Sequence, residues 1–126
     1  MPAPHILADS SIWIDHINMG DEILANLLRR RRILMHPMIF GEVSLGSIAH
    51  RKFVLNELKK LPQLPSLSHT EAIAMIEWQE LHNCGVGYVD IHLLGATLQV
   101  ADGRLWTRDK RLRAQAERLG IDANLN

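Results

Sequence analysis

Short apolar segments alternate with helix-patterned segments along this chain, and no two of the short segments adjoin as a hairpin would require. Residues 6–8 (ILA), 33–37 (ILMHP) and 103–107 (GRLWT) are typical of strands, and the stretches between them carry apolar residues at helical spacing. Strands that alternate with helices favour a parallel sheet covered by helices. The pattern therefore predicts an α/β fold in which a central, mostly parallel β-sheet is flanked by α-helices.

Capping and breaking residues predict where several helices begin. Ser10 or Ser11 is available as the N-cap of a helix that follows the first strand, Pro37 suits the first turn of another, and Ser68 with Glu71 forms a capping box. The remaining predicted elements are a helix at 21–32, helices at 37–49 and 50–61, an extended crossing at 61–67, an apolar helix after the glycines of 85–87, a basic helix at 108–120 and a possible last strand at 121–125.

Length and composition limit the class of protein. The chain has 126 residues without a repeat or a linker, so we expect a single domain over 1–126. No apolar run reaches the roughly 18 residues that cross a bilayer, and the first residues do not resemble a signal peptide. Cys84 is the only cysteine, which excludes an internal disulfide and a cysteine-based zinc site. These features favour a cytoplasmic protein without membrane contact.

Three aspartates stand where such a sheet would gather its functional groups. Asp9 directly follows the first strand, and Asp109 comes just after GRLWT. Ligands of parallel sheets bind beyond the carboxyl ends of the strands, so two neighbouring strands would project both carboxylates into one crevice. Asp90 lies in the first turn of the apolar helix, where its small and apolar neighbours draw it toward the interior.

Each acid also has a structural alternative. Asp9 and Asp109 would serve as plain helix N-caps, and Asp90 as an anion at the positive end of a helix. Glu42 has an apolar residue one turn away on either side, so we expect it at or near the buried face of its helix. An unpaired glutamate is rarely fully buried, and an ion pair with an arginine is its alternative.

A divalent cation would explain all four acids together. Carboxylates that share a partly apolar site raise one another's pKa, and a hard cation with oxygen ligands relieves that repulsion. Acids without a histidine or cysteine partner suit Mg²⁺ or Mn²⁺ better than Zn²⁺. Such an ion activates water and stabilises the charge that develops on a phosphodiester under attack. The conjunction of the four acids therefore predicts a metal site.

Four short motifs, ILADSSIWID, IFGEV, GYVDIHLLGAT and LWTRDKRL, are similar in order and spacing to those of the PIN-domain endoribonucleases. More closely, the chain resembles the VapC-type toxins of VapBC toxin–antitoxin pairs, and the resemblance runs from about His5 to the last predicted strand. It implies a PIN-like three-layer fold and a Mg²⁺- or Mn²⁺-dependent endoribonuclease. It also implies RNA as substrate, a cognate VapB-type antitoxin as partner, and a homodimer.

The resemblance assigns a role to each matching residue. Asp9, Glu42, Asp90 and Asp109 match the acids that hold the metal and carry catalysis. Ser11 and Thr107 match hydroxyl positions that support the carboxylates or waters. The last motif of the family often continues to an aromatic residue, whereas RDKRL stands here, so the packing beside Asp109 differs while the carboxylate is kept.

Basic residues flank the last acid. The 14 basic residues balance the 14 acidic ones, so four acids committed to a metal would leave a surplus of four positive charges elsewhere. Arg108, Lys110 and Arg111 are the candidates for RNA contact, because phosphate contacts give affinity without sequence information. Their alternatives are a solvated helix face or a contact with the antitoxin, and for the arginines of 29–32 a solvated helix end is favoured.

Other functions fit less well. A catalytically idle PIN-like binding module is the main alternative, and the complete set of acids speaks against it. An aspartyl phosphatase needs a second aspartate two residues after Asp9, where Ser11 stands. The acid pattern of a receiver domain is also absent.

The histidines and tryptophans suggest packing rather than chemistry. The seven histidines show no metal-binding spacing, and His92 is expected to pack or to lie at the surface. Trp13, Trp78 and Trp106 are expected in the core.

Overall fold

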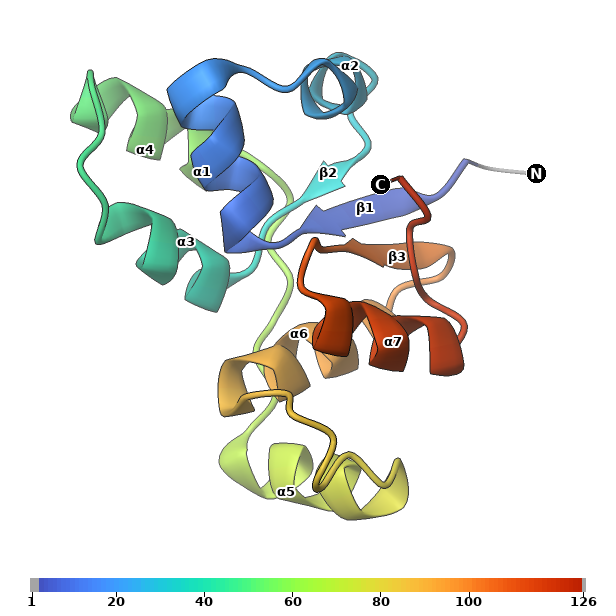
Figure 1. Ribbon diagram of the computed structural model, residues 1–126. Coiled ribbons are helices and arrows are strands. Elements are labelled where there is room, and N and C mark those ends of the chain that lie inside the picture. Colours follow the sequence, from blue (N-terminus) through green and yellow to red (C-terminus); the bar gives the residue numbers. More distant parts are fainter. Residues whose placement is uncertain (1–2, 126) are drawn as a thin grey trace.

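A computed structural model describes residues 3–125 of the chain (Figure 1). Its elements follow the predicted alternation of strands and helices. In chain order they are β1 (His5–Ala8), α1 (Ser10–Met19), α2 (Glu22–Arg29), β2 (Ile33–Leu34), α3 (Pro37–Ser44), α4 (Arg51–Lys59), α5 (His69–Trp78), α6 (Tyr88–Leu98), β3 (Gly103–Trp106) and α7 (Lys110–Arg118).

The three strands form one parallel sheet in the order β2-β1-β3. Leu7 of the central strand pairs with Leu34 on one side and with Leu105 on the other, and all three side chains are buried. The predicted last strand at 121–125 is reduced to a single parallel bridge between Leu105 and Asp122. The prediction of an α/β fold with a parallel sheet is confirmed.

The helices lie in two groups around this sheet (Figure 1). Helices α1 to α4 gather on the β2 side, whereas α5, α6 and α7 lie on the β3 side. The extended segment predicted at 61–67 carries the chain from the first group to the second, and Met35 and Gln63 form a parallel bridge on the way. The carboxyl ends of β1 and β3 therefore lie where the two groups of helices meet.

Local signals fix most helix starts. Pro37 opens α3, Ser68 and Glu71 form the predicted capping box of α5, and both agree with the sequence. The prediction of Ser10 or Ser11 as the cap of α1 is wrong. Asp9 is the N-cap, because its carboxylate accepts a hydrogen bond from the Ser10 amide at 2.6 Å.

The core forms around the sheet and the inner faces of α1, α3 and α6. Two of the three tryptophans belong to it, since Trp13 and Trp106 are 3% and 1% exposed. Trp78 is 84% exposed, so its prediction as a core residue is wrong. It is the last residue of α5, a helix that buries little besides Ala72. Within residues 3–125, no helix has the length and apolar character needed to span a membrane.

Candidate active site

The neighbouring strands β1 and β3 end side by side, and the residues that follow them are joined by hydrogen bonds. The Asp9 amide donates to the Trp106 carbonyl at 2.9 Å. The buried Thr107 hydroxyl donates to Oδ2 of Asp9 at 2.8 Å and accepts from the Asp109 amide at 3.1 Å. Thr107 thus connects the first and the last acid of the predicted site, which lie 100 positions apart in the sequence.

Asp9 and Asp109 also cap helices. Oδ1 of Asp9 accepts from the Ser10 amide at the start of α1, and Oδ1 of Asp109 accepts from the amides of Arg111 and Leu112 at 2.9 and 3.0 Å. Two helix N-termini, each carrying partial positive charge, therefore point toward the same region. The capping interpretation and the site interpretation hold at once, because one carboxylate has two oxygens with two lone pairs each.

Asp90 lies half-buried in the first turn of α6, and its Oδ2 accepts from the Gly87 amide at 2.9 Å. Burial raises the pKa of Asp90, and the negative charges of Asp9 and Asp109 raise it further, although the bond from Gly87 acts in the opposite direction. The effect of two other carboxylates on this pKa shows that α6 brings Asp90 close to both.

Glu42 completes the cluster from α3. Partial loss of hydration raises its pKa, a hydrogen bond from the Ser10 hydroxyl lowers it, and the charges of Asp9 and Asp90 raise it again. The expectation that Glu42 lies at or near the buried face is wrong, because the core stripe of α3 is formed by Ile39 and Val43. Glu42 is exposed and faces the other acids instead.

The donor set of this acid cluster (Asp9, Glu42, Asp90 and Asp109) fits a hard divalent cation. All of its ligand atoms are carboxylate oxygens, and burial, with the charges of the other acids added to it, raises the pKa of Glu42 and of Asp90. Across residues 3–125, no three acidic, histidine or cysteine side chains are grouped so that they could hold one ion together. Mg²⁺ does not require such a cage, because it usually takes one or two carboxylates and keeps several waters.

Ser10 is a hydroxyl that the sequence assigned only to capping. Its single hydroxyl proton is shared between Oδ1 of Asp9, 3.3 Å from its Oγ, and the carboxylate of Glu42, so Ser10 lies between the N-cap of α1 and an acid of α3. Ser11, the hydroxyl position suggested by the family resemblance, is exposed, and its supporting role stays a prediction. The only sequence signal for Ser10 was its place directly after a capping acid.

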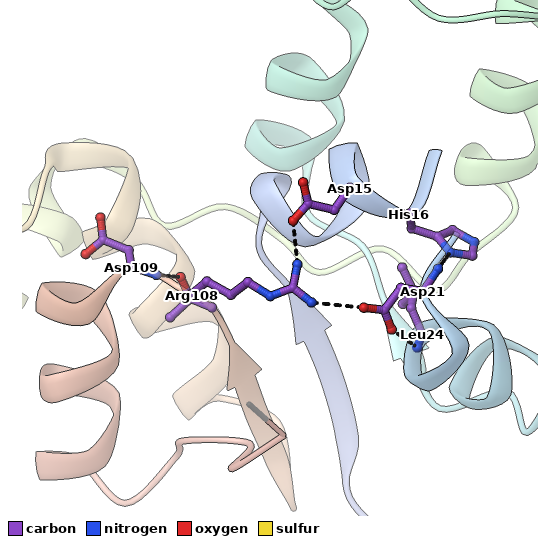
Figure 2. A network of polar contacts seen from close by, with 7 residues as sticks. Asp15, His16, Asp21, Leu24, Arg108 and Asp109 are labelled. Carbon is purple, nitrogen blue, oxygen red and sulfur yellow. Dashed lines mark hydrogen bonds and ion pairs between the residues drawn. The ribbon is translucent and has the colours of Figure 1, made fainter. Parts of the chain in front are cut away.

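The basic residues beside the acid cluster differ in what they contact. Arg108 extends away from Asp109 and forms ion pairs with Asp15 and Asp21 (Figure 2). Lys110 is exposed at the start of α7. Arg111 is exposed as well, and its side chain lies over Gly85, where an added Cβ would come within 2.5 Å of Cδ of Arg111. Arg111 therefore reaches from α7 to the loop that precedes Asp90.

The chain is similar in sequence to curated ribonucleases. The chain is 40% identical over 116 residues to the protein named "Ribonuclease VapC32" of Mycobacterium tuberculosis strains CDC 1551 / Oshkosh and ATCC 25618 / H37Rv. The match covers 92% of this chain and 94% of the relative in each case. No protein-family model matches the chain.

A solved structure shares the fold. The crystal structure of PAE2754 from Pyrobaculum aerophilum superposes with a TM-score of 0.60 and covers 92% of this chain and 86% of that one. Its sequence is 15% identical, so this likeness concerns the fold alone. The α/β, PIN-like architecture and the extent of the identity to the mycobacterial relatives lead to one assignment. This chain belongs to the VapC family of PIN-domain ribonucleases.

Proposed function

We propose that this protein is a divalent-metal-dependent endoribonuclease and the toxin of a type II toxin–antitoxin pair. The observation that supports it most is the convergence of four carboxylates from α3, α6 and the ends of β1 and β3. The pKa of Glu42 and of Asp90 is raised there by burial and also by the charges of the other acids. Sites that concentrate perturbed carboxyl groups in this way are typical of catalysis or metal binding.

The residues of this site have different roles. Asp9, Glu42, Asp90 and Asp109 hold the cation, directly or through water, and Thr107 and Ser10 fix the carboxylate of Asp9. A Mg²⁺ or Mn²⁺ ion bound there supplies activation of the attacking water and stabilisation of the charge on the phosphodiester. Ser11 has a supporting role by family resemblance.

The substrate side of the site is basic. Lys110 and Arg111 lie at the N-terminus of α7 directly after Asp109, and both are exposed. Cations beside an acidic, metal-binding pocket hold the RNA backbone through its phosphates, and the α7 N-terminus adds its own partial positive charge. Arg108 was grouped with these two on sequence grounds, but its guanidinium is engaged by two aspartates.

A VapB-type antitoxin and a second copy of the chain are the proposed protein partners. Exposed apolar side chains support this, since Phe53 of α4 is 64% exposed and Trp78 of α5 is 84% exposed. Each side chain lines a largely apolar hollow, Phe53 together with Val54 and Trp78 together with Met75, and the two hollows lie on helices of the two different groups (Figure 1).

Cleavage of total cellular RNA by the purified protein tests the proposal. We expect discrete cleavage with Mg²⁺ or Mn²⁺, none with a chelator, and none from Asp90→Asn, which keeps an acceptor for the Gly87 amide but loses the charge. Asp102→Asn, an exposed acid outside the acid cluster, is the control and should cleave like the wild type. If the folded wild type and Asp90→Asn are equally inactive, and both bind the antitoxin, the idle binding module is the better description.

A further inference from the structure

The loop 107–109 between β3 and α7 holds two residues of the candidate active site and, between them, an arginine whose side chain points away from it. Thr107 and Asp109 face the acid cluster, whereas Arg108 between them extends toward α1 and α2 (Figure 2). Its guanidinium lies 5.9 Å from the ring centroid of the buried Trp106, within the range of a cation–π contact. The guanidinium of Arg108 thus lies beside a buried ring of the core.

The guanidinium holds two carboxylates from separate elements. Nη1 of Arg108 pairs with Asp15 of α1, and Nη2 pairs with Asp21, the N-cap of α2, at 2.9 Å. The planar fork of arginine suits such a double contact, which a single ammonium group does not reproduce. These pairs connect residues 93 and 87 positions apart, and they span from the β3 side of the molecule to its β2 side.

Asp21 is itself held in place. Its Oδ1 accepts from the Leu24 amide at 2.9 Å, and its own amide donates to Nδ1 of His16 at 2.9 Å. Burial acts to raise the pKa of Asp21, but the Leu24 amide and Arg108 outweigh it, and the pKa is lowered. Arg108 therefore binds an acceptor whose position the turn between α1 and α2 already fixes.

A shift of the Arg108 backbone would displace residues of the acid cluster. Thr107 and Asp109 are its immediate neighbours, and Thr107 carries the hydrogen bond to Asp9. We propose that Arg108 is a positioning residue that anchors loop 107–109 to α1 and α2, and thereby keeps Thr107 and Asp109 aligned with Asp9. This inference rests on the proposed function of the acid cluster, and it separates Arg108 from the phosphate-binding role of its neighbours.

Two variants and their combination test the anchor. Arg108→Gln removes the fork, while Asp21→Asn removes one partner's charge but keeps an N-cap side chain. Misplacement of a reacting group by about 1 Å can cost on the order of 100-fold, so we expect Arg108→Gln to lower kcat about 10- to 100-fold. The affinity of the metal-free protein for Mn²⁺ should fall as well, and KM for RNA should not change. Asp21→Asn should act in the same direction. The double variant should be no worse than Arg108→Gln, because Arg108→Gln alone already removes the ion pair with Asp21.

Two other cations provide the comparison. Lys110→Gln should raise KM and reduce by about one the slope of log affinity for RNA against log salt, as the loss of a phosphate contact does. Arg113→Gln should leave kcat and Mn²⁺ affinity unchanged, because Arg113 pairs with Glu117 and Asp122 away from the acid cluster. Arg108→Lys should recover only part of the loss, since lysine lacks the fork.

The outcomes separate the two proposals. If Arg108→Gln keeps the wild-type kcat and Mn²⁺ affinity and instead behaves like Lys110→Gln, Arg108 is a phosphate contact and the positioning role is wrong. If the wild type cleaves no RNA, the proposed function fails. In that case the Mn²⁺ affinities of wild type, Arg108→Gln and Asp21→Asn still decide whether Arg108 aligns the acids.

Discussion

Replacement of Thr107 by valine removes the hydroxyl that joins the two ends of the site. The side chain is fully buried, and valine keeps nearly the same shape. The change deletes the hydrogen bond to the Asp9 carboxylate at 2.8 Å and leaves the Asp109 amide without its Thr107 acceptor. We expect a loss of stability together with a loss of metal affinity.

The expected loss in the free energy of unfolding follows from the two hydrogen bonds that the Thr107 hydroxyl makes. A hydrogen bond to a charged group contributes about 1.5–3 kcal/mol, and an amide left without its acceptor adds about 1 kcal/mol at a partly hydrated site. The sum is about 2.5–4 kcal/mol. For 126 residues, an unfolding entropy of about 2.1 cal/mol/K per residue converts this into a fall in Tm of about 9–15 °C.

Thermal and urea unfolding of the metal-free protein measures this difference, and Thr97→Val is the matched control. Thr97 is equally buried, but its hydroxyl donates to the neutral Leu93 carbonyl within α6 at 2.7 Å, so its loss should cost only about 1 kcal/mol. Equal losses for the two variants, or a loss below about 0.5 kcal/mol for Thr107→Val, would refute the coupling of Asp9 and Asp109 through Thr107.

Three further results are expected. The raised pKa of Glu42 and of Asp90 means that the folded protein holds these protons more tightly than the unfolded chain, so their stabilising effect is lost as pH rises through the raised values. Urea unfolding of the metal-free protein between weakly acidic and neutral pH should show this decline, and a Glu42→Gln variant with an unchanged slope would contradict it. Gly41→Ala should stabilise α3 by about 0.5–1 kcal/mol, because an added Cβ meets nothing within 4 Å there, and a lower Tm would be the contrary result. Gly103→Ala should destabilise by about 1–3 kcal/mol, because its Cβ would lie 2.7 Å from the backbone oxygen of Thr97, and a neutral effect in thermal unfolding would show that β3 has room to shift.

Local patterns predicted the parts of the fold that depend on neighbouring residues. The capping box at Ser68, the proline start of α3 and the strand ends before Asp9 and Asp109 are all set within a few positions of the chain. Because parallel neighbours end at the same edge of a sheet, the meeting of those two acids also followed from the order of elements.

Contacts between distant segments were not predictable in the same way. In the sequence, Arg108 is one of several cations beside Asp109, and only the tertiary fold brings Asp15 and Asp21 to it. The exposure of Trp78 likewise depends on what covers α5, and helical spacing within one segment cannot indicate that. Glu42 was expected near the core because apolar residues lie one turn away on either side of it. In the structure, the face of α3 that packs against the core is the adjacent one, which carries Ile39 and Val43.

Titration with Mn²⁺ of the metal-free wild type and of Asp9→Asn tests whether the carboxylate of Asp9 takes part in binding a metal ion. Asparagine keeps an oxygen for the Ser10 amide and remains a good N-cap, so α1 should persist. The bond from the Thr107 hydroxyl to the second carboxylate oxygen is lost, so the free energy of unfolding should fall by about 1.5–3 kcal/mol, and the variant should remain folded. We expect the wild type to bind Mn²⁺ and the variant to bind it with an affinity at least about 10-fold lower. Equal Mn²⁺ affinity in the two folded proteins, or no binding by either, would contradict this expectation and leave Asp9 as a helix cap alone.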